Sequence, residues 1–456
     1  MKRFVYQWLA ISSVLLTTLT AAETRPQYGG TLRVEINAAP ASLDPADNAQ
    51  TESLARWNVS ALMFDTLVQI DNGGHPISGL AQSWQASNNN RRWQFQIRPG
   101  VKFHDGTPLT AELAAASLRT ANPAWNVVAE HDQLIIERES SDPELLVELA
   151  LARNAIVRRD ADGKVIGTGP FRVVEWQPGR KLTLTANEDS WRGRPMLDGV
   201  EIEMGKSFRE QMTALELGKA DLVEVAPEQA HRLSQEGQAL ISSAPVELLA
   251  LVFTHDPATP EEKTLRDALS LSVDRASMRS VLLQGAGQPT ASLLPNWVSG
   301  YGFLFSTNAD LVKARQMRAQ VRGVSGWTLG YDIHDPLARL LAERIALNAK
   351  DAGLSLQPTS SASADVRIER MVLASSNAWV ALDNFLTQAA IAAPKDQGGT
   401  QEELYKNEQA ALAMDRVIPL MDLPITYAAA RNLKNISVRA DGRWNLADAW
   451  LESAKP

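Results

Sequence analysis

The sequence predicts a mixed α/β protein with two or three domains. The chain has 456 residues, 45% of them apolar, which is more than one hydrophobic core usually holds. Along the whole chain, segments in which apolar and polar residues alternate, as in strands, are followed by segments with the apolar spacing of helices. We find no internal repeat and no low-complexity tract, which argues against a repeat architecture.

The first elements follow from simple periodicity. Residues 30–36 alternate apolar and polar side chains, which predicts a strand. A helix is expected from about residue 52, where Leu54, Trp57 and Leu62 share one face.

The stretch over 93–112 predicts a strand, a turn, a second short strand at 101–103, a second turn and a helix. A Pro-Gly pair and an Asp-Gly pair supply the two turns. Thr110 is placed as the N-cap of the helix that follows.

Later segments continue the alternation. The run over 248–254 is apolar throughout, as expected for a central strand covered on both faces. The other elements that we expect are strands at 182–186, 200–204 and 221–225, a short helix at 208–217, one amphipathic helix at 261–284 and another at 336–352.

The N-terminus predicts export. Lys2 and Arg3 precede an apolar stretch over 4–16, and Thr20-Ala21-Ala22 offers small residues for cleavage after Ala22. A membrane anchor is the alternative, but polar residues leave this stretch short of the roughly 20 residues that a span needs. We expect a cleaved signal peptide over residues 1–22.

The absence of cysteine narrows the chemistry and the location. It excludes disulfides, thiolate metal sites, cysteine catalysis and the cysteine that carries the lipid of a lipoprotein. Together with the export signal, this predicts a freely diffusing periplasmic protein, secreted by a cleaved signal peptide and not a lipoprotein.

The charge balance disfavours nucleic acid as a partner. The net charge is −8, from 45 basic and 53 acidic residues, and no Lys/Arg cluster is longer than two residues, whereas phosphate binding needs a basic face.

Catalytic and metal-binding patterns are absent, so we expect no enzyme, no cofactor and no metal site. The six histidines are scattered, and no zinc, nucleophile-elbow or phosphate-loop motif is found. Asp44, Asp105 and Asp221 are in turns or at a strand start, where aspartate is favoured by local hydrogen bonds. His104 beside Asp105 lacks further ligands, and the Gly-Thr-Gly run at 167–169 reads as the entry to a strand because Pro170 lacks an amide donor.

Seven motifs, in the right order, resemble the extracellular solute-binding proteins of family 5, the peptide-, nickel- and glycoside-binding subunits of ABC importers. The stretch over 93–112, WQFQIRPGVKFHDGTPLTAE, carries the strongest resemblance. The others are YGGTL at 28–32 with SLDPA at 42–46, GTGPF at 167–171, N-x-x-x-W-x-G-x-P-x-L-D-G-V at 187–200, LGKAD at 217–221, LRDAL with VDR at 265–275, and the closing segments VIPL at 417–420 and 444–451.

The resemblance implies a two-lobed periplasmic binding protein clamshell with two hinge crossings and an extra inserted subdomain. Lobe one would comprise residues 24–50, 165–252 and 425–456, with the inserted subdomain at 51–164, and lobe two would comprise 256–422. The crossings would fall at Val252–Asp256 and Leu420–Thr426, beside Pro257 and Pro424.

The same resemblance implies a ligand site in the cleft between the lobes. Trp379 is similar to a tryptophan in the cleft segment of the family, but the segment over 379–386 is several residues shorter than the family pattern. It omits the aspartate that pairs with the amino terminus of a peptide, and Asp383 aligns with a later aspartate of that segment. The residues that we predict to bind ligand are Trp379, Asn37, Ala39, Pro40, Ala41, Phe253, His255, Asp332, His334 and Asp383.

Three functions are open at this stage. The first is the substrate-binding subunit of an ABC importer, a monomer that delivers a peptide-like solute, a glycoside or a metal chelate to an inner-membrane permease. The second is a binding module of the same fold that acts as a sensor or chaperone without transport. A secreted hydrolase is the third, and only turnover of a peptide or ester would support it.

Overall fold

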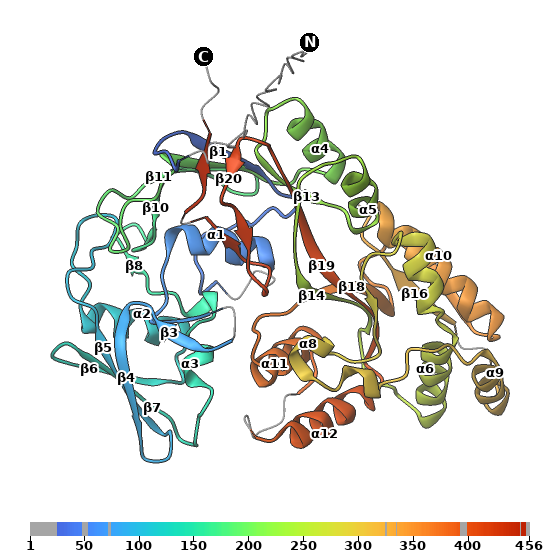
Figure 1. The fold of residues 1–456 in the computed structure, drawn as a ribbon. Helices are drawn as coiled ribbons and strands as arrows, with labels where there is room; N and C mark the ends of the chain where they lie inside the picture. Colours follow the sequence, from blue (N-terminus) through green and yellow to red (C-terminus); the bar gives the residue numbers. More distant parts are fainter. Residues whose placement is uncertain are drawn as a thin grey trace, which may run out of the picture.

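The computed structural model describes residues 25–47, 53–71, 74–323, 326–333, 335–392, 399–446 and 448–452. The predicted signal peptide lies outside these residues. Figure 1 shows two halves joined by the long strands β14 and β19 in the middle of the molecule. None of the helices in the described ranges is long and apolar enough to cross a membrane.

One large sheet runs through both halves. Its strands, in order across the sheet, are β10 (Phe171–Gln177), β11 (Lys181–Ala186), β12 (Gly199–Glu203), β1 (Thr31–Glu35), β13 (Leu222–Val225), β19 (Val417–Ala429), β14 (Leu240–Phe253), β18 (Val366–Val372), β16 (Gly326–Gly330) and β17 (Ser355–Thr359), with β15 (Gln288–Pro289) paired to β19. Strands β12, β1 and β13 are parallel on one side of the middle pair, and β18, β16 and β17 are parallel on the other.

The middle strands change partners part-way along their length. The first residues of β14 pair with the last residues of β19, which also pair with β13 on their other side. From Glu247 onward β14 pairs with both β19 and β18. The register between β14 and β19 is irregular around Pro245, which lies opposite Pro424. This change of partners falls within the predicted crossing at 420–426, but on β14 it precedes the predicted crossing at 252–256.

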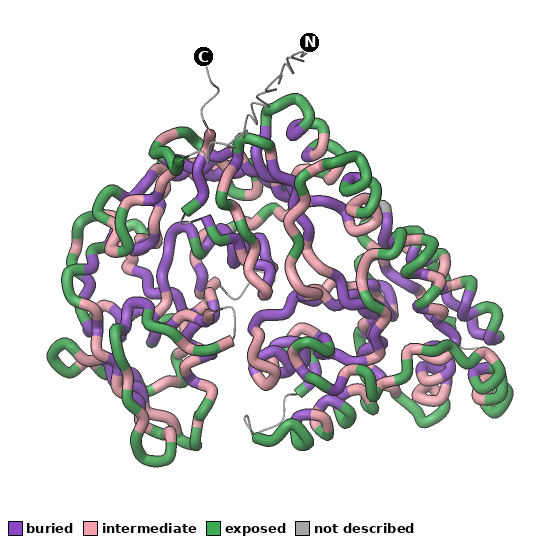
Figure 2. The backbone as a smooth tube through the Cα atoms, in the orientation of Figure 1, coloured by how far each residue is buried: buried purple, intermediate pink, exposed green. Residues whose placement is uncertain are grey.

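Helices cover both faces of the sheet in the half that contains β18. On one face a core of buried side chains unites α6 (Pro260–Ser272), α9 (Leu311–Gln320) and α10 (Pro336–Asp351) with the sheet. A second core, on the other face, involves α8 (Asn296–Ser299), α11 (Ala378–Gln388) and α12 (Gln401–Leu412). Figure 2 shows buried backbone along the middle strands and exposed backbone on the outer turns of these helices.

The half that contains β1 has its own core and a satellite subdomain. Helix α1 (Leu54–Met63) packs with β1, β11 and β12. The satellite is a four-stranded sheet of β4 (Ala81–Ser87), β5 (Arg92–Ile97), β7 (Gln133–Glu137) and β6 (Asn126–Glu130), packed on α2 (Ala111–Ala121) with a separate core.

The remaining elements are short. They are β2 (Val68–Ile70), β3 (Pro76–Ser78), β8 (Arg158–Arg159), β9 (Val165–Ile166), β20 (Leu433–Lys434), β21 (Ser437–Val438), β22 (Trp444–Asn445), β23 (Trp450–Leu451), α3 (Leu145–Glu148), α4 (Phe208–Glu216), α5 (Pro227–Gln235), α7 (Arg275–Ser277), the 3₁₀ helices η1 (Ala152–Asn154) and η3 (Gly302–Leu304), and the π-helix η2 (Met278–Leu282).

The prediction of a strand at 101–103 is wrong, because only a single bridge forms there, between Lys102 and Pro108. The turn begins directly after Phe103, and Pro108 has no amide to continue the ladder. The rest of this stretch is confirmed: the Thr110 side chain accepts a hydrogen bond from Leu113 N and caps α2. The Asp105 side chain accepts from Thr107 N at 3.0 Å, as a turn aspartate does.

The prediction of one continuous helix over 261–284 is also wrong. Helix α6 ends at Ser272, and Val273 has an extended backbone with ψ of 115°. The side chain of Asp274 accepts a hydrogen bond from Ser277 N at 2.9 Å and so starts a new turn, α7. Asparagine and aspartate compete in this way with helical hydrogen bonding. The apolar periodicity continues across the break, which is why periodicity alone missed it.

The Gly-Thr-Gly run at 167–169 has a structural role, as predicted. Gly169 N donates to Met63 O at the end of α1, and the Thr168 hydroxyl donates to Asp65 at 2.9 Å. His104 N donates to Gly167 O, and His104 Nε2 lies 3.0 Å from Gly169 O. Burial lowers the pKa of His104, so this side chain is part of the packing between α1 and the satellite subdomain.

Candidate functional site

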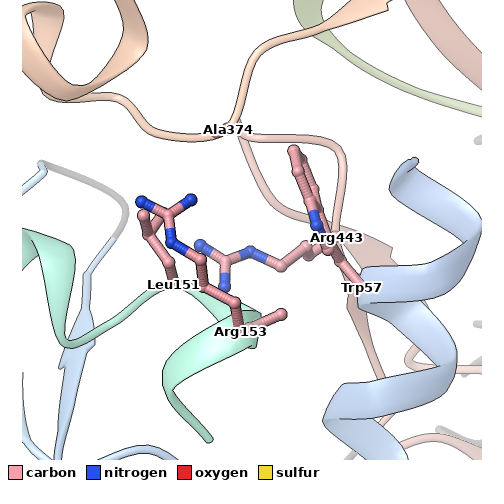
Figure 3. Close-up of a pocket in the computed structure, with 6 residues that line it drawn as sticks. Trp57, Leu151, Arg153, Ala374 and Arg443 are labelled. Carbon is pink, nitrogen blue, oxygen red and sulfur yellow. The ribbon is translucent and has the colours of Figure 1, made fainter. Parts of the chain in front are cut away.

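A pocket lined by both halves lies where they meet, and in this closed arrangement its cavity volume is about 10 Å³. Figure 3 shows the side chains that enter it, with Ala374 on the segment after β18 and the others on the facing half. The residues that line the pocket are Trp57, Leu151, Ala152, Arg153, Ala374 and Arg443.

The topology explains why a pocket forms at this place. Strand β13 ends where Val225 pairs with Thr426, and β18 ends where Val372 pairs with Glu247. The carboxyl ends of the parallel strands of both halves therefore point toward the same region of the middle pair. Crevices at the carboxyl ends of such strands are the usual ligand sites of α/β sheets.

Trp57 is held by the start of α1. The Ser53 hydroxyl caps this helix by accepting a hydrogen bond from Arg56 N. Only 6% of Trp57 is exposed, and it belongs to an apolar cluster with members from both halves. The cluster consists of Leu54, Trp57, Ile70, Val147, Ala150, Leu151, Val372, Ala374 and Val380.

Two arginines bring positive charge into the pocket. The guanidinium of Arg153 makes a forked pair with Glu148 at 2.8 Å. The guanidinium of Arg443 pairs with Asp441 at 2.8 Å, and Figure 3 shows the guanidiniums of Arg153 and Arg443 close to one another. Arg439 also contacts Asp441, and each of the two arginines that line the pocket is thus paired with a carboxylate.

Two arginines act on the ionisation of Asp441. Burial opposes ionisation of the Asp441 carboxyl, but Arg443 and Arg439 outweigh it and hold the pKa of Asp441 below its usual value. Guanidinium matches carboxylate and phosphate in shape and hydrogen bonding, so Arg153 and Arg443 are the lining side chains suited to contact an anionic group.

A polar contact joins the two halves beside the pocket. Asn377 Nδ2, before α11, donates to Glu144 Oε2, before α3, at 2.5 Å. Burial raises the pKa of the Glu144 carboxyl. This bond and the shared apolar cluster hold the pocket closed.

On the opposite face of the middle strands, an ionic group connects β14, β18 and α10. Arg370 pairs with Glu247 at 2.8 Å and with Asp335 at 3.0 Å. Asp335 also caps α10 through Leu337 N and Ala338 N. The nearby Asp332 was predicted to bind ligand; it is exposed, and the residue of this turn that reaches the crossing is Asp335. His334 lies outside the described residues.

Two of the residues predicted to bind ligand lie away from this pocket. Phe253 is 1% exposed, and its ring packs edge-on against Trp327 at 5.5 Å inside a core. His255 follows it at the far end of β14, where its ring lies 3.3 Å from Arg266 Nη2. The structure does not bring either residue to the pocket.

The predicted loop at 37–41 lies at the edge of the half that contains β1. Asn37 N donates to Glu224 Oε2 at 2.6 Å, and burial raises the pKa of Glu224 to about 6. Pro40 O accepts from Gly179 N, and Ala39 lies beside Gly179 and Gly205. These contacts of Asn37, Ala39 and Pro40 fix the loop to its own half.

Trp379 and Asp383 both lie on α11, whose N-cap Asn377 forms the contact with Glu144. Trp379 is half-buried against the core under α11. Neither residue lines the closed pocket, so their part in ligand binding stays a prediction. Sequence reasoning missed Trp57, Arg153 and Arg443, which come from three distant segments without a shared motif.

The described residues contain no group of three or more His, Cys, Asp or Glu side chains that could hold a metal ion. Charged side chains near the pocket are arranged instead as arginine–carboxylate pairs.

Comparison with known proteins places these observations in a family. Residues 75–382 match the model of "Bacterial extracellular solute-binding proteins, family 5 Middle". A probable D,D-dipeptide-binding periplasmic protein of Escherichia coli is 26% identical over 311 residues, which are 61% of this chain and 60% of that protein. A nickel-binding protein of Staphylococcus aureus is 26% identical over 243 residues, 50% of this chain and 49% of the relative.

A solved structure shows the same fold over nearly the whole chain. An ABC transporter-associated periplasmic binding protein from Helicobacter pylori, in complex with the peptide STSA, superposes with a TM-score of 0.80 at 18% identity and covers 94% of this chain and 99% of its own. The aligned stretches span only about half to three fifths of the two sequence relatives, while the family model covers two thirds of this chain. The chain therefore belongs to the bacterial extracellular solute-binding proteins of family 5, with the two-lobed fold of that family.

Proposed function

We propose that this protein is the periplasmic substrate-binding subunit of an ABC importer. It captures a small solute in the pocket between its halves and delivers it to an inner-membrane permease. Membership of family 5 supports the class of function. The observation that carries the proposal is the pocket itself, which both halves line and which lies at the two connecting strands.

The lobes and the location are part of the same proposal. Lobe one comprises 24–50, 165–252 and 425–456 with the subdomain at 51–164, and lobe two comprises 256–422. The protein works as a monomer, reaches the periplasm by a cleaved signal peptide, and carries no lipid.

The pocket favours a small ligand with an anionic group. The cavity between the closed halves has a volume of about 10 Å³, room for about one water molecule, so a solute would enter this site only with the halves opened. The guanidiniums of Arg153 and Arg443 would contact the anionic group, and the Trp57 ring would contact an apolar part. An anionic metal chelate or a short peptide that binds through its carboxylate satisfies this description.

Ligand binding should close the halves, because a ligand that contacts both stabilises the closed state. A change from 1:99 to 99:1 closed needs about 5.5 kcal/mol of preference for the closed state. The test is a screen of peptides, glycosides and metal chelates by thermal shift and intrinsic tryptophan fluorescence. If no compound of the peptide, glycoside and metal-chelate sets raises the melting temperature, the importer proposal is contradicted.

Arg443→Gln is expected to weaken binding of anionic solutes by about 10- to 100-fold, which corresponds to the roughly 1.5–3 kcal/mol of a hydrogen bond to a charged group. The measurement is titration calorimetry with the dipeptide Ala-Phe and its C-terminal amide as probes. We expect the loss for the free carboxylate only.

Arg431→Gln is the matched control, because Arg431 is an exposed arginine of the same C-terminal segment that does not line the pocket. Equal affinities of Arg443→Gln and the wild type for Ala-Phe would remove Arg443 from the site.

Glu144→Ala is expected to shift the unliganded protein toward an open form, because it removes the hydrogen bond from Asn377. Ligand affinity should fall several-fold, since fewer molecules are closed in advance. The measurement is the radius of gyration by small-angle X-ray scattering, with and without ligand. Glu130→Ala, at an exposed position of the same subdomain, should leave the radius unchanged; an unchanged radius for Glu144→Ala would show that the contact does not hold the halves together.

A further inference from the structure

A second recess lies on the half that contains β18, away from the pocket between the halves. Its cavity volume is about 380 Å³, and one side is open to solvent. Its walls are α6, the end of α12 and the first residues of β19, at the opposite end of β19 from Pro424. The two sites share no lining residue. Figure 1 shows α6 and α12 at the lower right, below the middle strands.

Arg275 is the exceptional residue of this recess. It is 3% exposed, and its guanidinium reaches only backbone oxygens among the described residues. Nε donates to Pro419 O at 2.9 Å and Nη1 to Ser270 O at 3.3 Å. No carboxylate lies within ion-pair distance of this guanidinium in the described part of the chain.

The other cations that line the recess have acidic partners. Lys263 pairs with Asp415, and Arg266 pairs with Glu262. The buried charge of Arg275 is therefore the one in the lining that is balanced by carbonyl dipoles alone. Burial without a charged partner also lowers the pKa of Arg275 to about 10, which agrees with this geometry.

The chain holds Arg275 in this position by breaking a helix. The extended backbone at Val273 and the Asp274 cap redirect the chain, and the π-helix over 278–282 follows. Insertions of this kind interrupt helical hydrogen bonding and are frequent at functional sites. An uncompensated buried charge is costly unless a counter-charge or metal accompanies it.

We propose that this recess is a second binding site, which takes one small oxyanion such as phosphate, sulfate or a carboxylate, with Arg275 as its charge partner. The guanidinium offers donors in a planar fork that suits oxyanions. The open side of the recess gives the anion access from solvent, and the site functions independently of the pocket between the halves.

The test is titration of the purified mature protein with inorganic phosphate by calorimetry, at constant ionic strength maintained with chloride. We expect one saturable site in the wild type and its loss in Arg275→Gln. Arg279→Gln removes the same charge from an exposed arginine in the next turn and should retain the site. Absence of saturable binding in the wild type, or unchanged binding in Arg275→Gln, would overturn the proposal.

Two further variants keep the test decisive. Ser270→Glu places a carboxylate in the recess beside Arg275 and should abolish phosphate binding while the protein stays folded by circular dichroism; retained phosphate binding would argue against Arg275 as the partner, even if Arg275→Gln fails to fold. Loss of binding in Arg443→Gln with retention in Arg275→Gln would place the anion between the halves and overturn the proposal.

Discussion

Gly167→Ala is expected to destabilise the protein by about 3 kcal/mol or more, enough to abolish folding in part of the molecules at 37 °C. An alanine Cβ at this position would lie 2.0 Å from Met63 O and 2.4 Å from the Phe64 ring. The nearest atom is a backbone oxygen at the end of α1, which cannot rotate away as a side chain could. The end of α1 and the turn at 167–169 would have to move apart. Since Trp57 lies on α1, the same change should also weaken ligand binding.

The measurement is the free energy of unfolding from urea denaturation, followed by tryptophan fluorescence. Gly326→Ala is the control, because a Cβ there meets nothing closer than 3.4 Å and the substitution lowers the entropy of the unfolded chain, which makes it neutral or slightly stabilising. Similar unfolding midpoints for the two variants would contradict the close packing at Gly167.

Asp422→Asn is expected to stabilise the protein by about 2–4 kcal/mol at pH 7. Asp422 is 5% exposed on β19, and burial is the main cause that raises its pKa to about 8. A hydrogen bond with the Thr290 side chain lowers the pKa, and the nearby charge of Glu408 raises it. The folded protein therefore holds a proton on Asp422 that the unfolded chain releases above about pH 4. An asparagine resembles the protonated carboxyl in shape and cannot ionise in the unfolded chain.

The sign of the pH dependence follows from the raised pKa. The contribution of Asp422 to stability is complete below the pKa of about 3.8 that it has in the unfolded chain and is lost as the pH rises toward 8, because the folded state binds more protons in this range. The advantage of Asp422→Asn should thus be near zero at pH 4 and largest at pH 8.

Urea denaturation at several pH values between 4 and 8 measures this advantage. Asp448→Asn, at an exposed aspartate, should follow the wild type at every pH. An advantage of Asp422→Asn that is the same at pH 4 and pH 8 would show that Asp422 is ionised in the folded protein.

Local sequence signals predicted most individual elements. The Thr110 cap, the strand over 182–186 and the helix over 336–352 have their determinants within a few residues, and the structure confirms them. The break at Val273 was missed because apolar spacing continues through it, whereas the cap that breaks the helix comes from one aspartate side chain. The length of β14 was underestimated because its first half is only partly buried.

The residues predicted to bind ligand stay predictions, because the pocket between the closed halves is lined by other side chains. The loop at 37–41 and α11 were located near the cleft by resemblance, yet the closed pocket is lined by Trp57, Arg153 and Arg443. These side chains come from three segments that are far apart in the sequence. In the sequence, each arginine near a carboxylate is indistinguishable from an ordinary surface ion pair. Phe253 lies within the predicted crossing at 252–256; the structure places its ring in a core, and the register of β14 against β19 is irregular at Pro245.

By itself the sequence determined the fold class, the family and the expected export, because these depend on periodicity, turn residues, composition and motif order, which are written locally along the chain. Only the tertiary structure decided which side chains share a pocket and which charges lack a partner. Those properties depend on distances between segments that the sheet brings together, and a buried arginine such as Arg275 differs from an exposed one only in its surroundings.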